Sequence, residues 1–243
     1  MLESVGWGAV AGSSLLVGAA IALIVPVRLR ALGLVMAFGA GVLISAVSYE
    51  LVEEAFRTSN GGIGVALGLG AGCAVFFLGD TALDRFGARG RKRSSGGQES
   101  GSGLAIVLGT VLDGIPESIV IGLTLLTGGS VSVAVIAAVF LSNLPEAIAA
   151  TTGLRNAGWT RVRVIALWAV VALVTALSSL AGFALFGGAP PEAIAFTLAF
   201  AGGAILTMLA DTMMPEAFEN GGRLIGVFTT LGFGVAFALT SLE

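Results

Sequence analysis

The chain has 243 residues, of which 56% are hydrophobic and 11% charged, with a formal net charge of −3 and a mean hydropathy of +1.00. The surface of a soluble domain is normally about a quarter to a third charged, so this composition excludes a soluble globular protein. We predict an all-α integral membrane protein. The single cysteine, Cys73, excludes a disulfide framework within the chain.

Eight apolar runs follow one another along the chain, each of the length of about 20 residues that a helix needs to cross a bilayer. They are continuous rather than alternating, which favours helices over the strands of a membrane barrel. We expect the spans at residues 5–25, 32–54, 62–83, 103–127, 130–152, 162–187, 192–215 and 222–241. Residues 1–243 then form one transmembrane domain. The first run has no basic segment before it and no clear cleavage site, so we interpret it as an uncleaved span.

The basic residues predict how the chain is oriented. The connections after the first, third, fifth and seventh spans hold all of the 12 Lys and Arg residues except Arg57. The positive-inside rule then puts these connections in the cytoplasm and both termini outside the plasma (inner) membrane, on its extracellular or periplasmic side. The basic, Gly- and Ser-rich segment 85–103 is predicted to be a solvated cytoplasmic loop. A lipid-binding or regulatory patch is the alternative.

An internal repeat relates the second and seventh spans. Residues 37–56 align without a gap on residues 199–218, and both segments then run into Asn-Gly-Gly. Identical pairs are Ala37/Ala199, Phe38/Phe200, Gly41/Gly203, Glu54/Glu216, Ala55/Ala217 and Phe56/Phe218. Spans of this separation cross the membrane in opposite directions, so we predict inverted repeats in a 3+2+3 arrangement, as in alternating-access transporters. Chance similarity between Ala- and Gly-rich helices is the alternative.

Two Pro-Glu pairs lie inside the fourth and fifth spans, in the matching segments 113–119 (DGIPESI) and 142–148 (SNLPEAI). A carboxylate in the middle of a span costs about 2.5 to 3.5 kcal/mol even on the lenient insertion scale, and such groups mark ion pathways. Each proline also lacks the N–H that would bond the carbonyl four residues before it. Both spans are therefore predicted to present a backbone oxygen beside an acid.

Helical geometry assembles these groups into a candidate pocket. Asp113 and Glu117 lie one turn apart on the fourth span, and Ser142, Asn143 and Glu146 occupy corresponding places on the fifth. Three carboxylates together in a low dielectric cannot all stay ionised unless a cation is present, so cation binding is expected to displace protons. The alternative is structural, with protonated Glu117 and Glu146 bonding the carbonyls at the two kinks.

At these residues the chain resembles the ZIP family of divalent metal transporters, particularly its bacterial branch. The family reads His-Asn-x-Pro-Glu-Gly on its fourth span and a similar polar-x-x-Pro-Glu on its fifth. The resemblance places Asp113 at the His position, Gly114 at the Asn position and Glu117 at the Glu position. On the fifth span it places Ser142 and Asn143 at the polar pair, and Glu146 is the shared acid. It implies a metal site between these spans.

The resemblance extends to the acids of the second and seventh spans. Asp211 and Glu216, beside Pro215 at the cytoplasmic end of the seventh span, are similar to the family's acidic Pro-Glu helix end and are expected to be exit-side ligands. Three further acids near the extracellular end of the second span are expected to attract cations at an entrance, with an ordinary solvated helix end as the alternative. They are Glu50, Glu53 and Glu54.

The departures from the family pattern bear on the metal. The chain contains no histidine, and Gly182 stands where many relatives carry a bridging Glu on the sixth span. We therefore expect one site of oxygen ligands rather than a binuclear centre. Hard oxygen ligands suit Mn²⁺, Mg²⁺ or Fe²⁺ as readily as Zn²⁺.

The function expected from this is transport of a divalent cation, of the Zn, Mn or Fe(II) class, by an elevator or rocking motion without nucleotide. An enzyme is not expected, and neither is an organic cofactor. Two alternatives remain: another cation or a proton-coupled substrate on the ZIP scaffold, and a non-transporting metal sensor. The lipid bilayer and metal ions are the expected partners and nucleic acid is not, while a homodimer stays open.

Overall fold

The computed structural model describes residues 1–59, 62–85, 103–127 and 132–242. Within these ranges every regular element is helical, as the continuous apolar runs predicted. The long helices are α1 (Leu2–Ile24), α2 (Leu29–Ala46), α4 (Ile63–Leu83), α5 (Gly103–Thr127), α6 (Val133–Asn156), α7 (Arg161–Phe186), α8 (Pro191–Met208) and α10 (Ile225–Thr240). The predicted loop 85–103 lies outside the described residues except for its two ends.

Two of these helices continue through a short π-helical segment into a further helix. After α2 the chain forms η1 (Val47–Val52) and α3 (Glu53–Thr58), and after α8 it forms η3 (Leu209–Met213) and α9 (Met214–Gly221). Val47 and Leu209, the first residues of the two π-helical segments, occupy the same position of the sequence repeat. Such single-turn π segments are rare and frequently occur at functional sites.

By length and composition, seven helical stretches of the described residues could cross a membrane. The sequence predicted eight such stretches. The difference lies at the C-terminal end, where the predicted seventh and eighth spans fall in one helical stretch of 50 residues, Pro191–Thr240. Inside it, the short 3₁₀ turn η4 (Gly222–Leu224) joins α9 to α10.

The chain reverses its direction at this 3₁₀ turn. Gly222 has φ +65°, a left-handed conformation that glycine adopts without the steric cost of a side chain. From the start to the end of α2, the residues of α9 and α8 that it contacts have decreasing numbers, so these helices run antiparallel to α2. The residues of α10 that it contacts have increasing numbers, so α10 runs parallel to α2. The antiparallel pairs are Gly33 with Ala217 and Val47 with Gly202, and the parallel pairs are Phe38 with Gly232 and Glu50 with Thr240. Therefore α10 runs back alongside α9 and α8.

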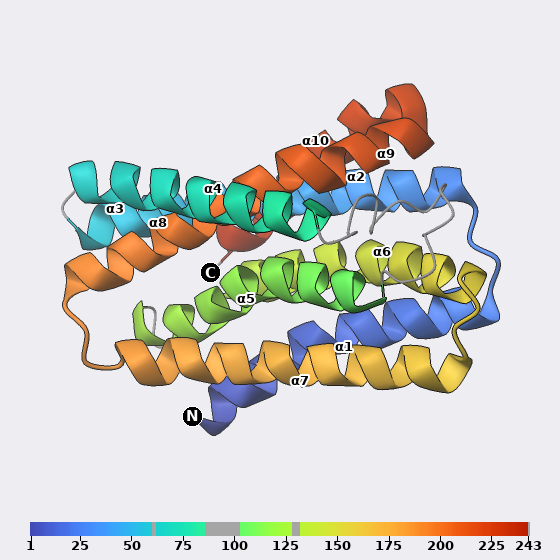
Figure 1. Cartoon of the computed structure of the whole chain (residues 1–243). Coiled ribbons are helices and arrows are strands. Elements are labelled where there is room, and N and C mark those ends of the chain that lie inside the picture. The colour runs from blue at the N-terminus through green and yellow to red at the C-terminus, as the bar shows by residue number, and fades with distance from the viewer. Residues whose placement is uncertain (60–61, 86–102, 128–131, 243) are drawn as a thin grey trace.

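The helices pack in two layers (Figure 1). We call α2, α4, α8 and α10 the first layer, and α1, α5, α6 and α7 the second layer. In the first layer α4 packs along α8 and α2 along α10, while in the second α1 packs along α6 and α7, and α5 along α7. The layers meet chiefly through α2 with α6 and α5 with α8. This pattern of contacts is the same for both halves of the repeat.

Most of the described arginines gather at one end of the molecule, where α1 leads into α2, α6 into α7 and α9 into α10 (Figure 1). Arg28 precedes α2, Arg155 ends α6, Arg161 begins α7 and Arg223 lies in η4. Arg57 lies instead in the last turn of α3, at the opposite end. The one-sided charge that the sequence predicted is thus a property of the folded helices.

Candidate cation site

The candidate site is built on α5 and α6, the two described helices that carry an internal proline. Pro116 and Pro145 lie well inside their helices, and both helices continue past them. Because a proline has no N–H, Pro145 cannot donate to the carbonyl oxygen of Leu141, nor Pro116 to that of Leu112. The helices are therefore weakened at these carbonyls without being broken.

All five residues of the predicted pocket are buried. Asp113 and Glu117 on α5 are each 2% exposed, and on α6 Ser142 is 0% and Asn143 and Glu146 are each 4% exposed. Charged groups are almost never buried to this degree unless they are paired, hydrogen-bonded, metal-bound or neutralised. Burial therefore separates these acids from the surface acids at the helix ends.

Glu117 and Ser142 come together across the two helices. The Ser142 hydroxyl lies 3.4 Å from Oε1 of Glu117 and 3.0 Å from the carbonyl oxygen of Val139, so its proton is shared between these two acceptors. The shorter contact to Val139 is within the helix, and the longer one connects α6 to α5. The contact that the sequence predicted between the fourth and fifth spans is present at this pair.

The three carboxylates do not assemble into one metal-binding cluster in this conformation. Among the residues that the structure describes, no group of three or more Asp, Glu or Cys side chains is placed to hold a metal ion. Asp113 and Glu117 share a helix and lie one turn apart, and the shorter Asp113 side chain reaches less far. The arrangement supplies buried oxygen ligands on neighbouring helices, with the closest cross-helix pair formed by Glu117 and Ser142.

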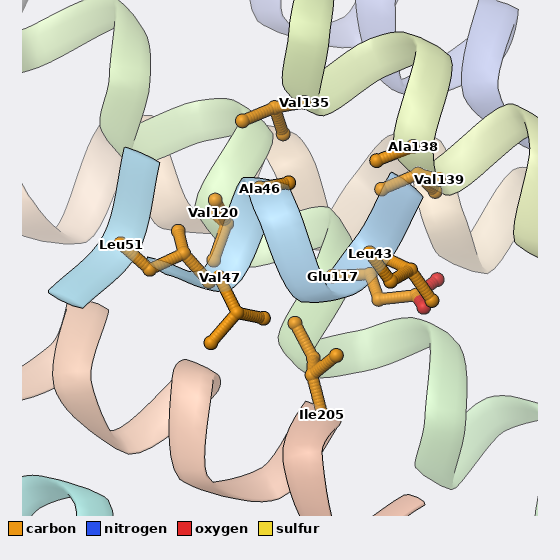
Figure 2. Close-up of a pocket in the computed structure, with 10 residues that line it drawn as sticks. All are labelled: Leu43, Ala46, Val47, Leu51, Glu117, Val120, Val135, Ala138, Val139 and Ile205. Atoms are coloured by element: carbon orange, nitrogen blue, oxygen red, sulfur yellow. The ribbon is translucent and has the colours of Figure 1, made fainter. Parts of the chain in front are cut away.

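Glu117 faces a small cavity between the two layers (Figure 2). The cavity measures about 10 Å³, about the space that a single water molecule needs. Of the ten described residues that line it, Glu117 alone has a polar side chain. The rest of the wall is apolar and comes from five elements of both layers: Leu43 and Ala46 of α2, Val47 and Leu51 of η1, Val120 of α5, Val135, Ala138 and Val139 of α6, and Ile205 of α8.

The residues of this wall could not be predicted from the sequence. They are Val, Leu, Ile and Ala inside apolar spans, and nothing in their type distinguishes them from residues that face lipid or pack within a layer. The only available signal was the helical spacing of Leu43, Ala46 and Val47, which places them on one face of the second span.

The predicted exit-side acids occupy different environments. Glu216 in α9 is 5% exposed, and its backbone carbonyl accepts a hydrogen bond from the Asn220 side chain at 3.0 Å. Asp211 lies inside η3 and is exposed. The i→i+5 bonding of a π-helix rotates the residues before it relative to those after it. The directions in which the two acids point therefore differ from those they would have in a regular α-helix. Only Glu216 shares the burial of the pocket residues.

The predicted entrance acids are half-buried and each contacts a neighbouring side chain. Glu50 accepts a hydrogen bond at 2.8 Å from the hydroxyl of Thr240, at the end of α10. Glu53 pairs with Arg57 and Glu54 accepts from Thr58, in both cases four residues along the same helix. This is the arrangement of an ordinary helix end for Glu53 and Glu54, while Glu50 joins η1 to α10.

Comparison with known proteins adds no family to these observations, since no family model and no curated protein sequence matches the chain. The function is therefore argued from the buried carboxylates, the cavity and the arrangement of the helices.

Proposed function

We propose that this chain carries a divalent metal cation, of the Zn, Mn or Fe(II) class, across a membrane by alternating access through a site between α5 and α6. The observation that carries the proposal is the position of Glu117. Glu117 lines an otherwise apolar cavity between two layers of helices, and its carboxylate is within reach of the Ser142 hydroxyl. A carboxylate in such a place is costly to retain and marks an ion pathway.

The chemistry of the surrounding side chains supports a hard or borderline cation as the substrate. The buried groups Asp113, Glu117, Ser142, Asn143 and Glu146 offer carboxylate, hydroxyl and amide oxygens. Such ligands suit Mn²⁺ and Fe²⁺ as well as Zn²⁺. The resemblance of the two Pro-Glu segments to those of ZIP transporters supports the same class of substrate.

The proposed topology has eight spans, with α8 and α10 each crossing once and the chain turning at Gly222. The reversal of direction at Gly222 and the gathering of arginines at one end support it. With the arginine-rich end in the cytoplasm, both termini lie outside the plasma membrane. The matched π-helical segments of the second and seventh spans support the 3+2+3 inverted repeat.

Alternating access requires parts that can move relative to one another. The most extensive helix contacts are between helices of the same layer, whereas the layers meet chiefly through two helix pairs. In the proposed mechanism α5 and α6 carry the cation in the second layer, and this layer moves against the first, so that the cavity at Glu117 opens in turn to each side.

One observation favours a second candidate, the transport of a proton or another monovalent cation on the same scaffold. The described residues provide no cluster of three acidic groups that could hold a metal ion. A single buried carboxylate such as Glu117 is enough to carry a proton. The third candidate, a metal sensor that does not transport, is separated from both by a flux measurement.

The test is uptake by purified protein in liposomes that enclose a metal-sensitive dye and, in parallel, a pH-sensitive dye. Uptake of Zn²⁺ or Mn²⁺ by the wild-type protein, and its loss in Glu117→Gln, supports the proposal. The matched control is Glu192→Gln, an exposed acid in the first turn of α8. Proton flux without metal flux supports the second candidate, and no flux of either ion contradicts transport.

A further inference from the structure

Glycines hold the helices of each layer in backbone contact. At Gly41 and Gly232 a Cβ atom would collide with carbonyl oxygens across the α2–α10 contact, and at Gly72 and Gly203 across the α4–α8 contact. In the second layer a Cβ atom on Gly12 of α1 would lie 3.0 Å from backbone atoms of Ala172 in α7. Helices that approach this closely lose the freedom to slide past one another, because a packed backbone leaves no side chain to rearrange.

Between the layers, a glycine makes such a contact at one described place. A Cβ atom on Gly39 of α2 would lie 2.9 Å from the carbonyl oxygen of Leu141 in α6 and 3.3 Å from its carbonyl carbon. Among the glycines whose surroundings the structure describes, Gly39 is the only one that meets the backbone of the opposite layer so closely. At Gly79, for comparison, the nearest atoms across the layers belong to the flexible side chain of Leu112.

The carbonyl that Gly39 covers is the one to which Pro145 cannot donate. Without that intrahelical hydrogen bond, the Leu141 carbonyl is held less firmly parallel to the axis of α6. The Cα–H group of Gly39 lies against it, a weak contact of a kind that recurs between closely packed helices. A proline in one layer and a glycine in the other thus meet at a close backbone approach of the two layers.

This contact lies beside the cavity that contains Glu117. Gly39 precedes Leu43 by four residues and so lies one turn away on the same face of α2, and Leu43 lines the cavity. On α6, Leu141 follows the lining residues Ala138 and Val139. Any increase in the distance between α2 and α6 at Gly39 therefore widens the cavity on the side of the first layer.

We propose that Gly39 is a positioning residue: its contact with the Leu141 carbonyl sets how closely the two layers approach and so how fully the site at Glu117 is closed. The inference rests on the proposed function only in calling Glu117 the cation site. The spacing of the layers can be measured without any metal.

The experiment measures how fast a small methanethiosulfonate reagent modifies a cysteine placed at Ala138, a buried cavity-lining residue, in protein whose exposed Cys73 is replaced by Ser. Adding Gly39→Ala should raise the modification rate roughly fivefold to thirtyfold. Overpacking by one methyl group favours separated layers, and its free energy corresponds to an increase of this size in the population of separated layers. The rate is measured in lipid nanodiscs without metal.

The matched control is Gly12→Ala. At Gly12 the added Cβ would lie 3.0 Å from Ala172 backbone atoms, a similar crowding, but between helices of one layer. This variant should leave the rate at Ala138→Cys unchanged. Equal acceleration in both variants would mean that any crowding loosens the protein, and would overturn the proposal.

Pro145→Ala provides a second variant in case Gly39→Ala does not fold. It restores an N–H that bonds the Leu141 carbonyl within α6 and draws it away from Gly39, so modification of Ala138→Cys should again accelerate. An unchanged rate in Pro145→Ala, or in folded Gly39→Ala, would overturn the proposal. Acceleration in a protein that fails to carry metal in liposomes would leave this inference standing and contradict the proposed function alone.

Discussion

Acidic residues of α5 and α6 and those of α3 are buried to different degrees. In α5 and α6 the acids Glu117 and Glu146 lie in mid-helix, beside prolines, and are almost completely buried. In the first turn of α3, the acids Glu53 and Glu54 are half-buried and pair with residues four positions along their own helix. Burial, and not the number of acids, therefore distinguishes the proposed ion site from an ordinary helix end.

The largest effect is expected from Glu117→Gln, which changes one of the buried acids of this comparison. The amide keeps the shape of the side chain but removes its charge, so the protein should fold while metal uptake into liposomes falls by at least about 100-fold, as expected when a metal-site group is lost. Glu146→Gln should give a similar loss. Wild-type uptake in either folded variant would remove that residue from the site.

Glu53→Gln is the matched substitution among the half-buried acids. It removes one charge from a helix end where Glu53 pairs with Arg57, and exposed pairs of this kind contribute about 0 to 1 kcal/mol. Uptake should stay within about twofold of wild type, since the loss of an exposed pair changes the free energy of the protein very little. A loss as large as that of Glu117→Gln would show that the entrance acids belong to the site.

Asp113→His sharpens the comparison between this chain and the histidine-containing pattern it resembles. An imidazole at this buried position adds a borderline ligand that favours Zn²⁺ over Mn²⁺. Competition by Mn²⁺ against labelled Zn²⁺ should therefore weaken, measured side by side at one fixed pH because metal binding releases protons. An unchanged ranking of the metals would mean that residue 113 does not face the ion.

Ser142→Ala tests the cross-helix contact itself. The hydroxyl is shared between Glu117 and the Val139 carbonyl, and a typical hydrogen bond contributes about 0.5 to 1.5 kcal/mol. Metal affinity, measured by titration calorimetry, should fall by about threefold to tenfold. Ser48→Ala, which removes an exposed hydroxyl that bonds Ile44 of its own helix, should leave affinity unchanged. An equal effect of both variants would contradict the assigned contact.

The smallest effect is expected at the link between η1 and α10. Thr240→Val removes the hydroxyl that donates to Glu50 and should lower the free energy of unfolding by about 1 kcal/mol. The melting temperature in detergent should fall while metal affinity stays the same. A change in affinity without a change in stability would assign Glu50 to the ion pathway.

Much of the fold could be predicted because it follows from local chemistry. Continuous apolar runs predicted helices without strands, and the Pro-Glu pairs predicted buried acids in α5 and α6, as the structure describes them. The π-helical segments η1 and η3 could not be predicted, because a π turn depends on how the helix packs and leaves no mark in composition.

The candidate site was predicted less completely than the fold. Helical spacing put Glu117 and Ser142 on facing surfaces, but it could not give the rotation of α5 relative to α6, and the described carboxylates do not form the expected group of three. The cavity wall and the close approach at Gly39 arise where two layers meet. Such contacts join residues far apart in the chain, so spacing within one span carries no information about them.

The central claim, that Glu117 holds the transported cation, is tested most directly by equilibrium binding to purified protein in nanodiscs, with bound Zn²⁺ or Mn²⁺ counted by elemental analysis after dialysis. The account predicts that wild-type protein and Glu53→Gln retain the metal and that folded Glu117→Gln does not. Equal metal content in wild type and Glu117→Gln would contradict the claim.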